Sequence, residues 1–198
     1  LLGNAAVTSG THFLGPLGPV PLDLCTSGSR ALRLEPTTGT ANLIGGFGGN
    51  GAAAGAQGVV IGGGGTAGQA NLATDSYCVI GGGTLNQAGN ADGDPANASH
   101  AVVCGGVANS ARSMIATVVG GFWNTADGSG AFIGGGWGNT ANGARSVVAG
   151  GSNNTASGSR AFVGGGYLNT ASGWRAVVAG GEDNTASGDY SIVAGGYE

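Results

Sequence analysis

Pairs of adjacent apolar residues recur along the chain, each followed by glycine or by one small residue and then glycine. The first four pairs begin at Leu43, Val60, Val79 and Val102, at intervals of 17, 19 and 23 residues. The later pairs hold an interval of fifteen residues and are Thr117/Val118, Phe132/Ile133, Val147/Val148, Phe162/Val163, Val177/Val178 and Ile192/Val193. Short apolar runs bounded by glycine predict short β-strands, one for each pair.

An asparagine recurs at the same interval as the apolar pairs and opens repeats such as NTASGSRAFVGGGYL and NTASGWRAVVAGGED. These asparagines are Asn109, Asn124, Asn139, Asn154, Asn169 and Asn184. Self-similarity at so short a period predicts a solenoid, in which each repeat is one coil and buries its apolar face only against its neighbours. We therefore expect an all-β parallel β-roll (β-solenoid) of about ten fifteen-residue coils over residues 42–198. Its coils should be irregular over 42–108, where insertions occur, and regular over 109–198.

The size of the side chains sets the expected register of each strand. In SRAFVGGG, Ala161 and Val163 point to one side, and Phe162 and Gly164 point to the other. The residues equivalent to Ala161 are small in nearly every coil, which suits a narrow interior. The expected core of the coils is therefore Val118, Ile133, Val148, Val163, Val178 and Val193.

The opposite side of the same strands is also apolar, with Val147, Phe162 and Val177 among its residues. A strand that is apolar on both sides is normally buried on both. A coil of two short strands is too thin to cover both sides from within one chain. The pattern therefore predicts that the chain associates with copies of itself, most simply as a homotrimer. A monomer with one exposed apolar stripe is the alternative.

Residues 1–41 do not share the repeat. Residues 20–25 (VPLDLC) and 30–34 (RALRL) flank the turn TSGS and predict a β-hairpin. An uncovered end of a solenoid exposes unpaired backbone groups, so we expect this region to act as an N-terminal cap.

Composition favours a fibrous protein over an enzyme. The chain has 46 glycines in 198 residues, and only 8% of its residues are charged. All six basic residues are arginine, against ten acidic residues, so no basic patch is available for nucleic acid. The sequence has no apolar run long enough to span a membrane and no signal-peptide pattern, and its start without Met is that expected of a piece of a longer protein.

The motif RAVVAGG followed by NTASG resembles the head repeats of YadA-like trimeric autotransporter adhesins and the related repeats of phage-type fibre proteins. The resemblance covers residues 42–198. It implies a left-handed trimeric β-roll at an extracellular, cell or virion surface that binds host glycans or matrix proteins. The period differs, since adhesin heads usually repeat every fourteen residues, and RAVVAG replaces the core NSVAIG. The stalk and membrane anchor of such adhesins are not in this sequence.

Two sets of side chains recur on the expected surface. Arg145, Arg160 and Arg175 share one repeat position, where they either extend to acceptors such as Asp183 or bind an anionic glycan. Aromatic residues share another position and either fill gaps between chains or stack on sugar rings. These are Phe122, Trp137, Tyr167 and Tyr197, with Trp123, Trp174 and Tyr190 expected nearby.

Two glycine- or acid-rich segments imitate ligand-binding motifs. Gly63, Gly65 and Gly68 match G-x-G-x-x-G, but no helix pattern follows, so we interpret them as part of the repeat. Asn90, Asp92 and Asp94 imitate the start of a calcium loop. Pro95 and Ala101 occupy the positions of its glycine and glutamate, so a solvated loop is the better interpretation.

Histidine and cysteine add no catalytic or metal motif. His12 and His100 are far apart, and no cysteine pairs with either at a useful spacing. Cys25, Cys78 and Cys104 are expected to be small buried apolar residues, with an inter-chain disulfide as the alternative.

The sequence thus predicts a non-enzymatic adhesion or fibre module without cofactor or metal. A purely structural filament subunit is one alternative. An ice-binding solenoid is another, because threonines stack with small polar residues two positions on and resemble the hydroxyl faces of insect-type antifreeze helices. These ladders are Thr140, Thr155, Thr170 and Thr185, with Asn142, Ser157, Ser172 and Ser187.

Overall fold

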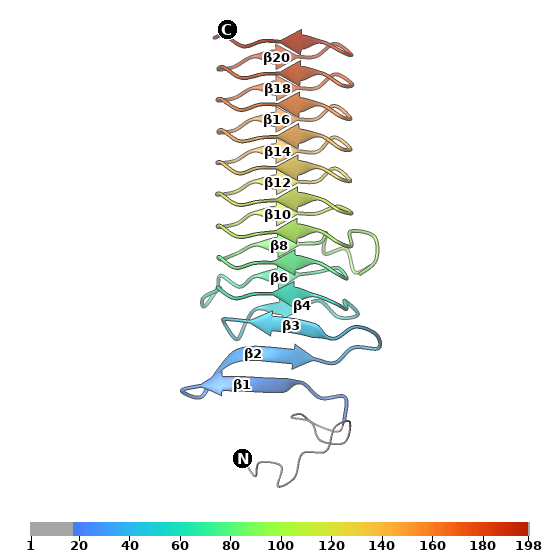
Figure 1. Ribbon diagram of the computed structural model, residues 1–198, viewed down its shortest axis with the longest axis vertical. Coiled ribbons are helices and arrows are strands. Elements are labelled where there is room, and N and C mark those ends of the chain that lie inside the picture. The colour runs from blue at the N-terminus through green and yellow to red at the C-terminus, as the bar shows by residue number, and fades with distance from the viewer. Residues whose placement is uncertain (1–17, 198) are drawn as a thin grey trace, which may run out of the picture.

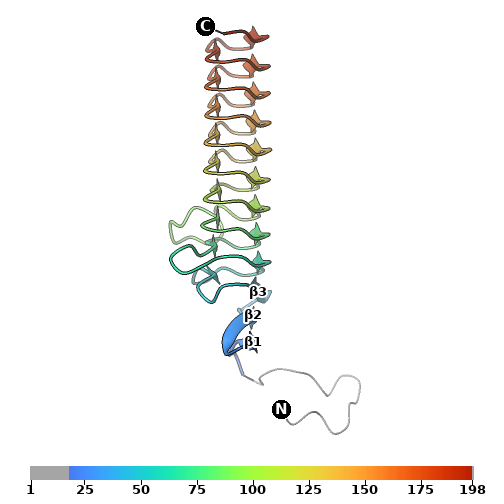
Figure 2. The ribbon, with the colours of Figure 1, turned by 90° about the vertical axis from the view of Figure 1, so that its left-hand side faces the viewer.

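The computed structural model describes residues 18–197, and every regular element within them is a β-strand. The chain winds into a rod of stacked coils, with a hairpin at its N-terminal end and the last coil at the other end (Figure 1). Two sheets run along the rod, one on each broad side of the flattened coils (Figure 2). This architecture confirms the predicted β-solenoid of about ten coils.

The larger sheet contains twelve strands, in the order β1, β2, β3 and then the odd-numbered strands up to β21. Ten of them, β3 to β21, belong to the coils. The bounds are Leu22–Thr26 (β1), Ser29–Glu35 (β2), Asn42–Gly45 (β3), Val60–Ile61 (β5), Val79–Ile80 (β7), Val102–Val103 (β9), Thr117–Val118 (β11), Phe132–Ile133 (β13), Val147–Val148 (β15), Phe162–Val163 (β17), Val177–Val178 (β19) and Ile192–Val193 (β21).

The smaller sheet contains nine strands, all even-numbered, which lie on the other side of the coils. Their bounds are Gly51–Ala52 (β4), Leu72–Ala73 (β6), Gln87–Ala88 (β8), Ser110–Ala111 (β10), Thr125–Ala126 (β12), Thr140–Ala141 (β14), Thr155–Ala156 (β16), Thr170–Ala171 (β18) and Thr185–Ala186 (β20). All coil-to-coil pairs are parallel, and in the regular part each residue pairs with the one fifteen positions on, as Val148 does with Val163.

The core lies between the two sheets. In most coils the larger sheet contributes one inward valine or isoleucine, which faces one inward alanine of the smaller sheet. Val118, Ile133, Val148, Val163 and Val178 are fully buried, and Val193 of the last coil is partly buried against them. The smaller sheet supplies inward alanines such as Ala141 and Ala156. Ala161 is also buried while Phe162 is not, so the register follows the expected alternation.

The periodic asparagines form a buried ladder at the turn that leads into the smaller sheet. The side-chain amide of Asn139 donates to the carbonyl oxygens of Gly135 and Gly151, both at 2.9 Å. Its side-chain oxygen accepts from the backbone N–H of Asn154 at 2.9 Å. Each asparagine thus satisfies backbone groups in two coils that would otherwise be buried without partners, which is why the position tolerates so little change along the chain.

Residues with positive φ mark two turns of each regular coil, and most of them are not glycine. Arg160 (φ 60°) precedes β17 and its backbone N–H donates to the carbonyl of Ala144, in the preceding coil. Leu168 (φ 56°) precedes the buried Asn169. A left-handed backbone costs about 1 kcal/mol per non-glycine residue. Here the hydrogen bond to the neighbouring coil offsets that cost.

The N-terminal hairpin continues the larger sheet beyond the first coil. β1 and β2 pair antiparallel around Ser27 and Gly28, as predicted, and β2 pairs antiparallel with β3. Strand pairing places Arg33 beside Ile44, which points into the core. Arg33 forms an ion pair with Asp23 at 2.8 Å, and this contact lowers the pKa of the Asp23 carboxyl group. Arg30 donates to the carbonyl oxygen of Asn50 at 2.7 Å. The apolar interior therefore ends at Ile44, and the hairpin is held to the first coil.

Candidate interaction surface

The outer face of the larger sheet carries one continuous apolar column that crosses all twelve strands. Strand pairing aligns its members, which are Leu22, Leu34, Leu43, Val60, Val79, Val102, Thr117, Phe132, Val147, Phe162, Val177 and Ile192. Phe132 and Phe162 are each 38% exposed, and Ile192 is 74% exposed. Thr117 is the only member that is not apolar. We call this set the outer apolar column.

A second column lies beside it on the same face, two positions after the first-column residue in every strand except the antiparallel β2, where it lies two positions before. Its members are Leu24, Leu32, Gly45, Gly62, Gly81, Cys104, Val119, Gly134, Ala149, Gly164, Ala179 and Ala194. Neither column contains a charged residue. Together they form a smooth, uncharged strip that runs the length of the rod.

The outer face of the smaller sheet is polar at the corresponding positions from β8 to β20, whereas β4 and β6 carry Gly51 and the exposed Leu72 there. Thr125, Thr140, Thr155, Thr170 and Thr185 stack in register. Asp127, Asn142, Ser157 and Ser172 follow two residues later and are exposed. The two faces therefore differ in character although one repeat generates both.

The turn before each strand of the larger sheet holds the arginine ladder. Arg145, Arg160 and Arg175 are exposed and make no ion pair or side-chain hydrogen bond to residues 18–197, so the expected contact with Asp183 is absent there. The guanidinium carbon of Arg175 lies 4.2 Å from the ring centroid of Trp174 and 5.6 Å from that of Tyr190. Stacking on rings in its own chain keeps Arg175 extended at this edge.

The turn after each strand holds the aromatic ladder, which a series of parallel bridges aligns. Phe122, Trp137 and Tyr167 belong to it, in line with Ser152 and Glu182. Phe122 and Trp137 contact edge to face, with ring centroids 6.4 Å apart. Trp123 packs against Phe122 as expected. The expectation for Trp174 and Tyr190 was wrong, because both precede their strands and lie at the arginine turn, where their centroids are 4.7 Å apart.

Two of the three cysteine expectations were also wrong. Cys78 takes the place of a small core residue, and burial raises the pKa of its thiol to about 11. Cys25 and Cys104 are exposed, because they fall on the hairpin and on the outer strip instead of the coil interior. All three carry free thiols.

The eleven-residue segment 90–100 closes on itself through its own amides. The side-chain amides of Asn90 and Asn97 donate to the carboxylate of Asp92, at 3.1 and 2.6 Å. The backbone N–H of Asp94, followed by the amide of Asn97, lowers the pKa of Asp92. His100 stacks on Tyr77 with ring centroids 5.1 Å apart. His12 lies outside the described residues.

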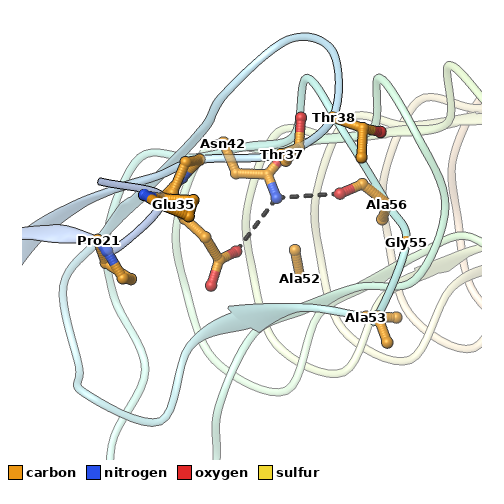
Figure 3. Close-up of a pocket in the computed structure, with 12 residues that line it drawn as sticks. Pro21, Glu35, Thr37, Thr38, Asn42, Ala52, Ala53, Gly55 and Ala56 are labelled. Atoms are coloured by element: carbon orange, nitrogen blue, oxygen red, sulfur yellow. Dashed lines mark hydrogen bonds between the residues drawn. The ribbon is translucent and has the colours of Figure 1, made fainter. Parts of the chain in front are cut away.

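A shallow hollow of about 440 Å³ lies where the hairpin meets the first coils (Figure 3). Pro21, Glu35, Thr37 and Ala53 are among its lining residues, and the amide of Asn42 donates to Glu35 and to the carbonyl of Ala56. Among the described residues, Glu35 is the one charged residue that lines it. No group of three metal-ligating side chains occurs within residues 18–197, and the glycines at 63, 65 and 68 precede the strand β6 instead of a helix.

No protein-family model matches the chain, and none of the curated proteins compared with it does. Residues 18–197 contain no helix that could cross a membrane. Sequence reasoning missed two features of the rod. It overlooked the leucines of the hairpin, although the alternation in VPLDLC and RALRL signals them, and it did not place the asparagine side chains inside the coils.

Proposed function

We propose that the chain is a non-enzymatic adhesion or fibre module that associates with copies of itself, as a homotrimer, through the outer strip of the larger sheet. The hairpin caps the N-terminal end of each roll in this proposal. The polar outer faces of the smaller sheets point outward and form a repetitive surface for a host glycan or matrix protein. The proposed location is extracellular, at a cell or virion surface.

The outer strip is the observation that carries the proposal. Contiguous exposed apolar surface beyond a few hundred Å² usually marks an interaction site. The strip extends over twelve strands spaced about 4.8 Å apart, which is a length of roughly 50 Å. A coil that faced only solvent could carry threonine or serine at these positions, as the coils do on the smaller sheet.

A second copy of the same chain is the partner that fits this strip best. Its apolar groups repeat with the rise of one coil, and a copy repeats with the same rise, so coils can meet one to one. The strip has no charge that would demand an oppositely charged partner. Cyclic assemblies bury such self-complementary strips around a closed axis. The resemblance to trimeric adhesin heads supports three copies.

Cross-linking at Cys104 tests this arrangement. The thiol is exposed on the strip, so copies that pack through the strip bring their Cys104 side chains close together. In a Cys25→Ser background, a short bismaleimide should join chains through Cys104. Moving the thiol to the polar face, in Cys25→Ser/Cys104→Ser/Ser157→Cys, provides the matched control. Equal yields from the two variants would contradict the proposal.

The ligand role needs its own test. Assembled protein would be applied to arrays of sulfated and sialylated glycans and of matrix proteins. Saturable binding that is lost on substitution of residues on the polar outer face supports adhesion. Absence of binding to every ligand leaves the purely structural fibre subunit as the function.

The threonine ladder favours ice binding as a second candidate. Thr140, Thr155, Thr170 and Thr185 stack in register on a polar face, and Ser157 and Ser172 lie two residues on. Thermal hysteresis at millimolar protein would support this function, and Thr155→Tyr should then abolish it. A freezing curve that matches a control protein would eliminate it.

A further inference from the structure

The outer strip is bordered by two edge columns that lie on opposite sides of the larger sheet. The residue two positions before each strand from β7 to β21 of the larger sheet is at one turn, and we call these residues the arginine edge. Its members all have positive φ and are Tyr77, His100, Ile115, Gly130, Arg145, Arg160, Arg175 and Tyr190. The bridged residues after each strand form the far edge, whose members are Thr84, Val107, Phe122, Trp137, Ser152, Tyr167, Glu182 and Tyr197. Figure 1 shows the two sets of turns at opposite borders of the rod.

Every coil thus carries a pair of edge residues seven positions apart, one at each border of the strip. Arg175 and Glu182 form the pair of one coil, and neither has an ion-pair partner within residues 18–197. Both are exposed. The strand β19 separates them, so they cannot satisfy each other within one chain.

The symmetry of the assembly decides which edges meet. Copies related by an axis parallel to the rod bring the arginine edge of one copy to the far edge of the next. A closed ring also forbids an axial shift, because any shift would generate an open filament. An antiparallel pair would instead bring arginine edge to arginine edge, with like charges facing each other.

The two edges are complementary when they meet in register. Arg175 faces Glu182, and Arg160 faces the ring of Tyr167, which suits an ion pair and a cation–π contact. Gly130, the one glycine of its edge, faces Trp137, the largest residue of the other. Ile115 faces Phe122, and Tyr190 faces Tyr197. Charge, size and polarity therefore match in five of the six successive regular coils, although a monomer would not need them to match. The sixth pair, Arg145 and Ser152, neither attracts nor repels strongly.

We propose that the arginine edge of one copy docks on the far edge of the next copy, parallel and in register, so that Arg175 meets Glu182 of its neighbour. This inference rests on the self-association proposed above and adds the residues that set its direction and register. The edge contacts lie at the rim of the interface, so they choose among arrangements, whereas the apolar strip supplies most of the stability.

Charge reversal at the two edges tests the pairing. Arg175→Glu and Glu182→Arg each place like charges together at every interface of the ring. Each should raise the concentration at which the assembly dissociates by about tenfold or more at low salt, with a smaller effect in 0.5 M salt. The double variant Arg175→Glu/Glu182→Arg should return to within about threefold of the unmodified chain. Mass by light scattering against concentration is the readout, and circular dichroism checks that each chain remains folded.

Two variants serve as matched controls. Arg145→Glu makes the same substitution at the same left-handed turn but faces Ser152, so it should weaken assembly less than Arg175→Glu. Arg160→Glu/Glu182→Arg would restore assembly only if the copies were shifted by one coil. Full assembly of both single variants, equal loss with Arg145→Glu, or rescue by the shifted pair would each overturn the inference. A monomeric unmodified chain would instead overturn the proposed self-association itself.

Discussion

The two sheets share one repeat and one interior, yet their outer faces differ. Val148 and Ala141 of the same coil are both fully buried, so the inward requirements of the two sheets are alike. Outside, the larger sheet presents Val147 and Phe162, whereas the smaller sheet presents Thr140 and Thr155. Folding of a coil requires only the inner residues. The apolar outer face of the larger sheet is therefore not explained by folding of the single chain, and under our proposal it is the contact between copies. The following predictions probe the difference between the two faces.

The largest effect is expected from a charge on the inner side of either sheet. Val163→Asp and Ala156→Asp each bury a carboxylate without a partner, which should destabilise the fold by more than about 4 kcal/mol. Circular dichroism should show loss of the β-sheet spectrum in both variants. A folded Val163→Asp protein with normal assembly would contradict the register.

A charge on the outer side should have a large effect on the larger sheet and little effect on the smaller sheet. Phe162→Asp places three carboxylates in the strip of the proposed trimer, and we expect association to weaken by at least about a hundredfold while the chain stays folded. Thr155→Asp makes a comparable change on the polar face and should leave the mass unaltered. Similar masses for the two variants would show that the faces are equivalent.

The turn that joins the two sheets offers a second comparison, between the buried Asn154 and the exposed Asn153 beside it. Asn154→Ala removes a buried amide that donates to Gly150 and Gly166, and it should cost about 3 kcal/mol because backbone groups lose their partners. Asn153→Ala changes an exposed residue at a left-handed turn (φ 54°), where alanine is less favourable than asparagine, and should cost only about 1 kcal/mol. Urea unfolding of the two variants, compared at constant protein concentration, measures both values.

The smallest effect is expected in the reactivity of the thiols, which can be measured without altering the fold. Burial raises the pKa of Cys78 to about 11, so its thiol stays protonated and shielded at neutral pH. Cys25 should react with iodoacetamide in every state. Cys104 should react several-fold more slowly in the assembled chain than in Phe162→Asp, a difference of rate that still allows cross-linking over a longer incubation. Equal rates at Cys104 in both samples would contradict burial of the strip.

Much of the fold could be predicted because the repeat constrains it. The fifteen-residue interval predicted the coils, and the alternation of Ala161, Phe162 and Val163 predicted which side is buried. The turns were harder, since the position of Trp174 relative to Tyr167 depends on which bend of the coil each residue occupies. Cys104 was misplaced because small residues occur both inside the coil and on the strip. The partner of the strip cannot be deduced from one chain, because its contacts lie outside that chain.

Self-association through the larger sheet is the central claim, and the absolute mass of the purified protein tests it most directly. Light scattering at micromolar concentration should give about three times the 18.7 kDa of the chain, or about 56 kDa, with Phe162→Asp at the mass of one chain. A mass near 18.7 kDa for the unmodified protein would contradict the account. The outer strip would then be a solvent-exposed face, and the ice-binding solenoid would become the leading function.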